Sequence, residues 1–131
     1  MSRFKRYLTE AFPRKLYHGT VGVLKLSPGV LYLTPSKKAA KQFGENPILA
    51  RGRKGTPRLY EIQAKPGKIK DIDEIVVEAL MQDEDVEAVI DQEAATARKE
   101  NYRYVEYDHG GEFLVVVSLY PDKDLKIVKF D

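Results

Sequence analysis

The chain contains no cysteine, no tryptophan and only two histidines, His18 and His109, among its 131 residues. The lack of cysteine excludes disulfide frameworks, thiolate metal sites and cysteine nucleophiles. With two histidines, a His-rich zinc site is not expected, and a Ser–His–Asp arrangement would have to use one of them. No apolar run approaches the ~20 residues of a membrane span. The charged N-terminus lacks the pattern of a secretory signal. We therefore expect neither a metal site nor a membrane partner.

The charges divide unevenly along the chain. Residues 1–70 hold 16 Lys and Arg but three acids, a balance of +13, whereas residues 71–131 hold 6 and 17, a balance of −11. The basic half is suited to an anion such as a dinucleotide or nucleic acid. Equally, the two halves could attract each other across a mixed surface. The 43% of hydrophobic residues suffices for one core.

Hydrophobic periodicity and turn residues predict the elements. A short amphipathic helix over 1–12 ends at Pro13, and we treat 13–131 as the main domain. The segment 44–57 has three Gly and two Pro and reads as a loop. Helices are expected at 37–43, capped by Ser or Thr and ending at Gly44, and at 74–82 and 83–100; strands are expected at 15–17, 30–34, 58–64, 69–72, 103–107, 112–119 and 124–130. This order predicts an α+β domain with a mostly antiparallel, split sheet.

Four pieces of sequence stand out together. His18-Gly19-Thr20 follows the first expected strand, and Tyr32 lies in the strand that begins after Gly29. Phe43 comes eleven positions after Tyr32, one helix further on. Glu112 opens the hydrophobic strand near the end of the chain. Each piece has a structural alternative: a turn histidine, two core aromatics and a charge that protects a sheet edge.

In this order and spacing, the set resembles the His–Tyr–Glu branch of the ADP-ribosyltransferases, which includes diphtheria toxin and the poly-ADP-ribose polymerases. The resemblance covers about residues 14–131. It implies an ADP-ribosyltransferase-like split sheet with flanking helices, and NAD as co-substrate. It implies that Glu112 and His18 serve catalysis, and that NAD is bound by His18, Gly19, Thr20, Tyr32, Thr34, Phe43 and Arg51.

The chemistry explains why such residues occur together. The nicotinamide–ribose bond of NAD breaks through an oxocarbenium-like transition state, as glycosidic bonds do. Backbone groups at Gly19 would hold the nicotinamide amide, because no side chain obstructs the approach. Tyr32 and Phe43 would stack on the two faces of the ring. His18 would bind the adenosine ribose, with its second nitrogen fixed by a backbone partner. A carboxylate would stabilise the charge that develops on the ribose.

Two residues compete for the acid. Glu106, in Val105-Glu106-Tyr107, also resembles the string around the acid in the toxin branch. We favour Glu112, because a hydrophobic strand, a Pro121-Asp122 turn and a final strand follow it in the expected order; Glu106 could as easily face solvent. The arginine-modifying branch has a second acid two residues before the catalytic one. Gly110 stands there, which disfavours an arginine acceptor, and the chain is too short for the extra domains of polymer-forming members.

The first residues carry a second resemblance. MSRFKRYLTEA is similar to the capsid-targeting peptides of internal head proteins of large myovirus-type bacteriophages, which are cut after the Glu, here Glu10. This implies phage head partners that bind residues 1–10, a place in the capsid interior and later action in the host bacterial cytoplasm. The structural alternative is an ordinary amphipathic helix that packs on the domain.

The combined expectation is a mono-ADP-ribosyltransferase that modifies a host protein or a nucleic acid. Three alternatives stay open. The first is a catalytically silent binding module on the same fold, and the second is a basic nucleic-acid-binding protein. The third is an RNA 2′-phosphotransferase, which would need several arginines in its site, with Arg51, Arg53 and Arg58 as candidates. In the loop 44–57, Arg51, Arg53 and Lys54 could bind the NAD pyrophosphate or a nucleic acid, or only solvate the loop.

Overall fold

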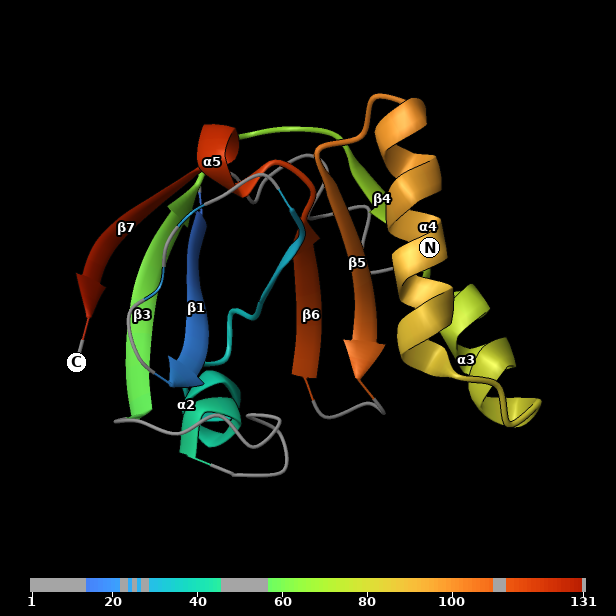
Figure 1. Cartoon of the computed structure of the whole chain (residues 1–131), viewed down its shortest axis with the longest axis horizontal. Coiled ribbons are helices and arrows are strands. Elements are labelled where there is room, and N and C mark those ends of the chain that lie inside the picture. The colour runs from blue at the N-terminus through green and yellow to red at the C-terminus, as the bar shows by residue number, and fades with distance from the viewer. Residues whose placement is uncertain are drawn as a thin grey trace.

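The computed structural model describes residues 14–21, 24, 26, 29–45, 57–109 and 113–130. Its architecture is α+β with two mostly antiparallel sheets (Figure 1). The strands are β1 (Arg14–Val21), β2 (Leu31–Leu33), β3 (Pro57–Ala64), β4 (Ile69–Asp71), β5 (Tyr104–His109), β6 (Phe113–Ser118) and β7 (Leu125–Phe130). The helices are α2 (Lys37–Glu45), α3 (Asp73–Met81), α4 (Val86–Lys99) and α5 (Pro121–Asp124).

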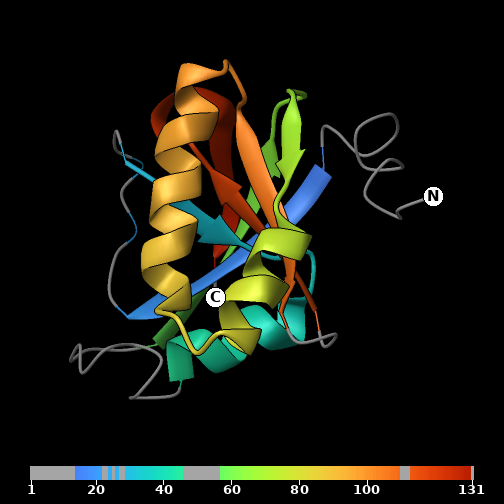
Figure 2. The ribbon, with the colours of Figure 1, turned by 90° about the vertical axis from the view of Figure 1, so that its right-hand side faces the viewer.

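The two sheets use separate strands. The first has the order β1-β3-β7 and the second has the order β2-β6-β5-β4. All pairs are antiparallel except β4 with β5, which are parallel and are connected through α3 and α4. Helices α3 and α4 cover the face of the four-stranded sheet that points away from the other sheet (Figure 1; Figure 2 shows α4 lying across this face). The sheet is therefore split, as the sequence predicts.

Two clusters of apolar side chains form the core, one on each face of the four-stranded sheet. The alternation along β5 and β6 separates them, because successive residues of a strand point to opposite faces. The first cluster lies between the sheets and contains Leu16, Leu33, Tyr60, Ile62, Ala64, Ile69, Tyr104, Leu114, Val116 and Leu125. The second lies under α3 and α4 and contains Ile72, Val76, Ile90, Ala94, Ala97, Val105, Tyr107, Val115, Val117 and Leu119.

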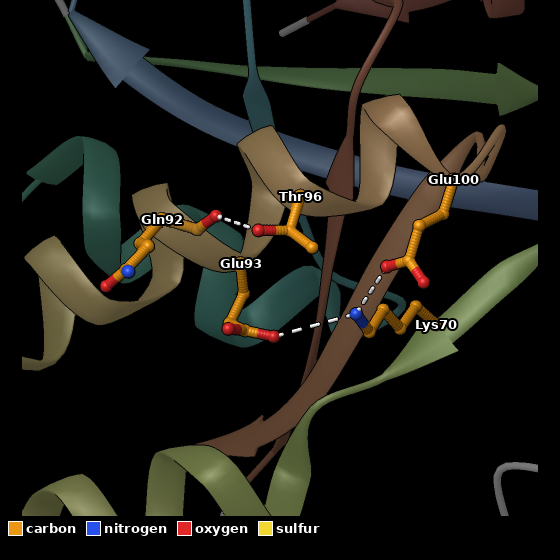
Figure 3. Close-up of polar contacts among 5 residues, drawn as sticks. All are labelled: Lys70, Gln92, Glu93, Thr96 and Glu100. Atoms are coloured by element: carbon orange, nitrogen blue, oxygen red, sulfur yellow. Dashed lines mark hydrogen bonds and ion pairs between the residues drawn. The ribbon is translucent and has the colours of Figure 1, made fainter.

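Polar contacts attach the short edge strand β4 to α4. Nζ of Lys70 on β4 donates to Oε1 of Glu100 at 2.9 Å and lies 3.7 Å from Oε1 of Glu93 (Figure 3). The hydrogen bond to Glu100 raises the pKa of Lys70 above its ordinary value. Lys70 thus joins the basic and acidic halves of the chain at this point.

Three expectations need correction. The first strand is not confined to 15–17: it pairs with β3 over its whole length, from Arg14↔Ala64 to Val21↔Pro57. His18, Gly19 and Thr20 therefore lie inside β1, because cross-strand pairing outweighs the low strand propensity of glycine. Residues 121–124 form a helical turn, α5, started by Pro121 at its first position, where a turn was expected. Helix α2 also runs past Gly44 to Glu45.

A fourth correction, which has consequences for the site, concerns Glu106. The expectation that this side chain could face solvent is wrong, since its exposed fraction is 0%. Both faces of β5 are covered, one by the other sheet and one by the helices, so the strand has no solvent side at this position.

Candidate functional site

The two sheets meet at one backbone bridge between β1 and β2, which are edge strands of their respective sheets. The N–H of Tyr17 donates to the carbonyl of Thr34 at 2.8 Å, and the N–H of Thr34 donates to the carbonyl of Tyr17 at 3.0 Å. In a continued antiparallel ladder the next residues to exchange such bonds would be Gly19 and Tyr32. The bridge is isolated instead, so the strands separate immediately after it.

His18 stands where the strands separate. Its Nδ1 lies 2.7 Å from the carbonyl oxygen of Tyr32. A carbonyl only accepts, so Nδ1 carries the proton and donates this bond. In the neutral form of the ring, Nε2 is then the acceptor nitrogen. The side chain of His18 thus satisfies the carbonyl that a continued ladder would have paired with Gly19, and a backbone group fixes one ring nitrogen, as expected from the sequence.

Gly19 follows one residue later, and its backbone direction comes from the strand geometry. Both backbone groups of Tyr17 point to β2, because both bond to Thr34. In an antiparallel strand, residues two apart direct their N–H and C=O groups to the same side. The N–H and C=O of Gly19 therefore also point toward β2, beside the His18 ring.

The inner face of the three-stranded sheet changes from apolar to polar along β1. Cross-strand partners point to the same face. The register pairs Leu16 with Ile62, then His18 with Tyr60, then Thr20 with Arg58. Since Leu16, Tyr60 and Ile62 belong to the inter-sheet core, His18, Thr20 and Arg58 lie on that same face, at its polar end. The three side chains are partly buried.

Tyr32 contributes its backbone and its ring to different places. The carbonyl meets His18, but the ring packs against the second cluster, on the helix-covered side of the four-stranded sheet. The residue is partly exposed, while its hydroxyl oxygen is buried. Because β2 is the edge strand of its sheet, a molecule bound at the junction with β1 can contact both faces of that sheet.

Thr34 and Ser36 start helix α2. Oγ1 of Thr34, a residue 3% exposed, accepts from the N–H of Ser36 at 3.1 Å. Oγ of Ser36 accepts from the N–H of Ala39 at 3.1 Å, which confirms the expected serine cap. Thr34 therefore has a structural role at the helix start. Phe43 lies in α2, as expected, and its side chain is outside the described part of the structure.

Glu106 and Glu112 differ in what the structure says of them. The carboxylate oxygens of Glu106 are buried, and its register partners are Val116 on β6 and Asp71 on β4. Alternation with Tyr104 places its side chain on the inter-sheet face. Glu112 lies outside the described residues, as do Arg51, Arg53 and Lys54; β6 begins at the residue after Glu112, with Phe113 paired to His109.

Sequence reasoning did not place Arg58 in an NAD site. It named this residue only for the phosphotransferase alternative. The register with Thr20 gives it a position on the His18 face, and the signal that could have found it is the two-residue alternation of β3, in which Arg58, Tyr60 and Ile62 share one face.

Two features are absent from the described residues. No group of three or more His, Asp or Glu there is arranged to hold a metal ion. No helix in the described ranges is long and apolar enough to cross a membrane. Comparison of the chain with protein-family models, with curated proteins and with solved structures found no match.

Proposed function

We propose that this chain is an NAD-dependent mono-ADP-ribosyltransferase whose site lies where β1 and β2 separate. The observation that carries the proposal is the hydrogen bond from Nδ1 of His18 to the carbonyl of Tyr32, at the isolated bridge between the sheets. It orients the histidine and leaves the Gly19 backbone directed to the same place. The ordered set of His18, Tyr32, Phe43 and Glu112 supports the same function.

In this proposal NAD binds along the polar end of the inner face. The N–H and C=O of Gly19 pair with the nicotinamide amide, and Nε2 of His18 bonds a hydroxyl of the adenosine ribose. Arg58 and Thr20 supply a positive charge and a hydroxyl for the pyrophosphate, to which Arg51 would add a second charge. The nicotinamide ring extends past the edge strand β2 to the helix-covered side of the four-stranded sheet, where the Tyr32 ring lies, and there Tyr32 and Phe43 stack on it.

The reaction breaks the bond between C1′ of the ribose and the nicotinamide nitrogen. Nicotinamide leaves with the bonding electron pair, and the acceptor nucleophile attacks C1′ and gives up its proton. A carboxylate beside the ribose stabilises the positive charge between these events. We assign this role to Glu112. Glu106 is completely buried, so it has no surface to offer a ribose in this conformation.

The roles of the two ring nitrogens of His18 can be tested separately with two variants, each of which replaces one nitrogen. In His18→Asn the amide N–H replaces Nδ1 and keeps the bond to Tyr32, but nothing replaces Nε2. In His18→Gln the reverse holds. We expect the NAD affinity of His18→Asn, measured by calorimetry, to fall about tenfold or more, while the variant still folds. The reason is that a hydrogen bond between neutral groups is lost and the ribose hydroxyl is left without a partner.

A matched control is Gln63→Ala, an exposed position on β3. This variant should bind NAD like the wild type. Equal affinity of wild type and His18→Asn would contradict the proposed ribose contact. Absence of NAD binding by the wild type would favour the silent binding module. Salt-dependent binding of DNA or RNA instead would favour the nucleic-acid-binding alternative.

We further propose that the protein travels in a phage head through residues 1–10, which are outside the described residues. From there it would reach the host bacterial cytoplasm and modify a host protein or nucleic acid. Mass spectrometry of the protein from particles should find an N-terminus at Ala11. An intact Met1 in mature particles would contradict cleavage after Glu10.

A further inference from the structure

Helix α3 has four exposed apolar side chains, and two of them, Val77 and Met81, lie beside two carboxylates, whereas Ile75 and Leu80 flank its buried side. Val77 and Met81 are 45% and 83% exposed and are four residues apart. Glu74 and Glu78 are also exposed and have the same spacing. Residues four apart on a helix are neighbours along its axis, so these pairs form two parallel rows, one apolar and one acidic.

The inward face of the same helix accounts for its place in the fold without these residues. Val76 and Ala79 are the buried members of α3, and Val76 belongs to the second core cluster. The rows of Val77/Met81 and Glu74/Glu78 lie on the opposite side by helical geometry. They line one shallow hollow together with Asp73 and Gln82. Two of these groups have local bonds: Asp73 accepts from the N–H of Asp108, and Glu78 accepts from Gln82.

The stretch of chain that contains α3 has a single sign of charge, although Glu93 within it is paired with Lys70 of β4. From residue 71 to residue 97 the chain has ten acids and neither Lys nor Arg. These acids are Asp71, Asp73, Glu74, Glu78, Asp83, Glu84, Asp85, Glu87, Asp91 and Glu93. A surface of this kind attracts cationic partners and repels acidic ones.

We propose that this face of α3 docks a basic amphipathic helix of another protein. A helix laid along α3 can present apolar side chains four apart to Val77 and Met81, and Lys or Arg four apart to Glu74 and Glu78. The apolar row supplies contact area and the acidic row selects the partner. Docking at α3 does not depend on NAD chemistry, so its test is independent of the test of the proposed function.

The test uses a fluorescent synthetic helix of about 16 residues with Leu and Lys in rows four apart, and a second peptide with Glu in place of every Lys. Anisotropy with the full chain should show saturable binding of the Lys peptide alone. Val77→Ser/Met81→Ser and Glu74→Gln/Glu78→Gln should each weaken it at least fivefold. Affinity should also fall when salt is raised to about 0.3 M, since the Debye length shortens.

Matched controls are Val128→Ser, an exposed apolar position on β7, and Asp91→Asn, an exposed acid on α4. Both should bind like the wild type, and melting curves should confirm that all variants fold. Equal binding by wild type and both α3 variants, or no binding at all, would overturn the proposal. Self-association of the chain that disappears in Val77→Ser/Met81→Ser would also overturn it, because the occupant would then be a second copy.

Discussion

At the scale of single residues, the contacts of His18 and Glu106 depend on strands that are distant in the chain. The Tyr32 carbonyl is the backbone partner of His18, and such a partner was predicted by the sequence. The sequence did not predict the burial of Glu106, because burial depends on what covers each face of β5, and those elements come from distant parts of the chain. For the same reason, the Tyr32 ring could not be assigned to one face from its own strand.

Burial of Tyr107 predicts an alkaline limit to stability. Burial, with a smaller contribution from Glu87, raises the pKa of this phenol to about 12 from 10.0. Below the lower pKa both states hold the proton; between the two values only the folded state keeps it, so stability falls as pH rises. The loss is on the order of 2–3 kcal/mol. Urea unfolding of wild type and Tyr107→Phe across this range should show a smaller decline in the variant; parallel curves would contradict it.

Gly67 predicts a steric requirement at one backbone position. A Cβ there would lie 2.7 Å from Cγ and 2.8 Å from Cβ of Arg103. These atoms are close to the backbone and cannot move far, so Gly67→Ala should cost about 1–3 kcal/mol. At Gly29 a Cβ would meet nothing within 4 Å. Thermal unfolding of both alanine variants tests this, and equal melting temperatures would argue against the contact.

At the scale of elements, local signals located most helices and strands but not their ends. Helices α3 and α4 and strand β3 match the predicted ranges within a few residues, because their apolar periodicity is strong. Strand β1 extends beyond the predicted 15–17, since its ends are fixed by pairing with β3. The residues of one strand do not show how far its pairing with a distant strand extends, so the ends of β1 could not be predicted from the local sequence.

The cap of α2 gives a test at this scale. Ser36→Ala removes the acceptor of the Ala39 N–H and should lower the free energy of unfolding by about 1 kcal/mol. Ser36→Asp keeps an acceptor and adds a negative charge at the helix N-terminus, so it should restore stability. Denaturant titration of the wild type and the two variants measures the three free energies of unfolding. A Ser36→Asp protein as unstable as Ser36→Ala would show that the cap is not the cause.

At the scale of the whole molecule, the division of charge survives folding. Lys70 joins the two halves by pairing with Glu93 and Glu100, whereas the pairs Lys15–Glu61 and Arg103–Asp124 each lie within one half. The sequence alone revealed the imbalance of charge between the two halves of the chain. Where these charges lie on the surface could be seen only from the fold. The acidic α3 and α4 region and the Arg58 end of β3 are separate surfaces on different sheets.

The link through Lys70 should be weak and sensitive to salt. Lys70→Met removes both ion pairs and should lower stability by at most about 1 kcal/mol at low salt, because both carboxylates are partly solvated. The difference should shrink at high salt. Unfolding curves of Lys70→Met, Glu100→Gln and the double variant give the coupling directly. A loss that is independent of salt would indicate packing of the lysine stem instead.

We propose that this chain cleaves NAD at the junction of its two sheets, with Glu112 as the acid. The most direct measurement is nicotinamide release from NAD by wild type, Glu112→Gln and Glu106→Gln, each checked for folding. We expect release by the wild type and by Glu106→Gln, with a loss of about a hundredfold or more in Glu112→Gln, as for a lost transition-state charge contact. Release that persists in Glu112→Gln and disappears in a folded Glu106→Gln would contradict the assignment of the acid. No release by any of the three would contradict the enzymatic function itself.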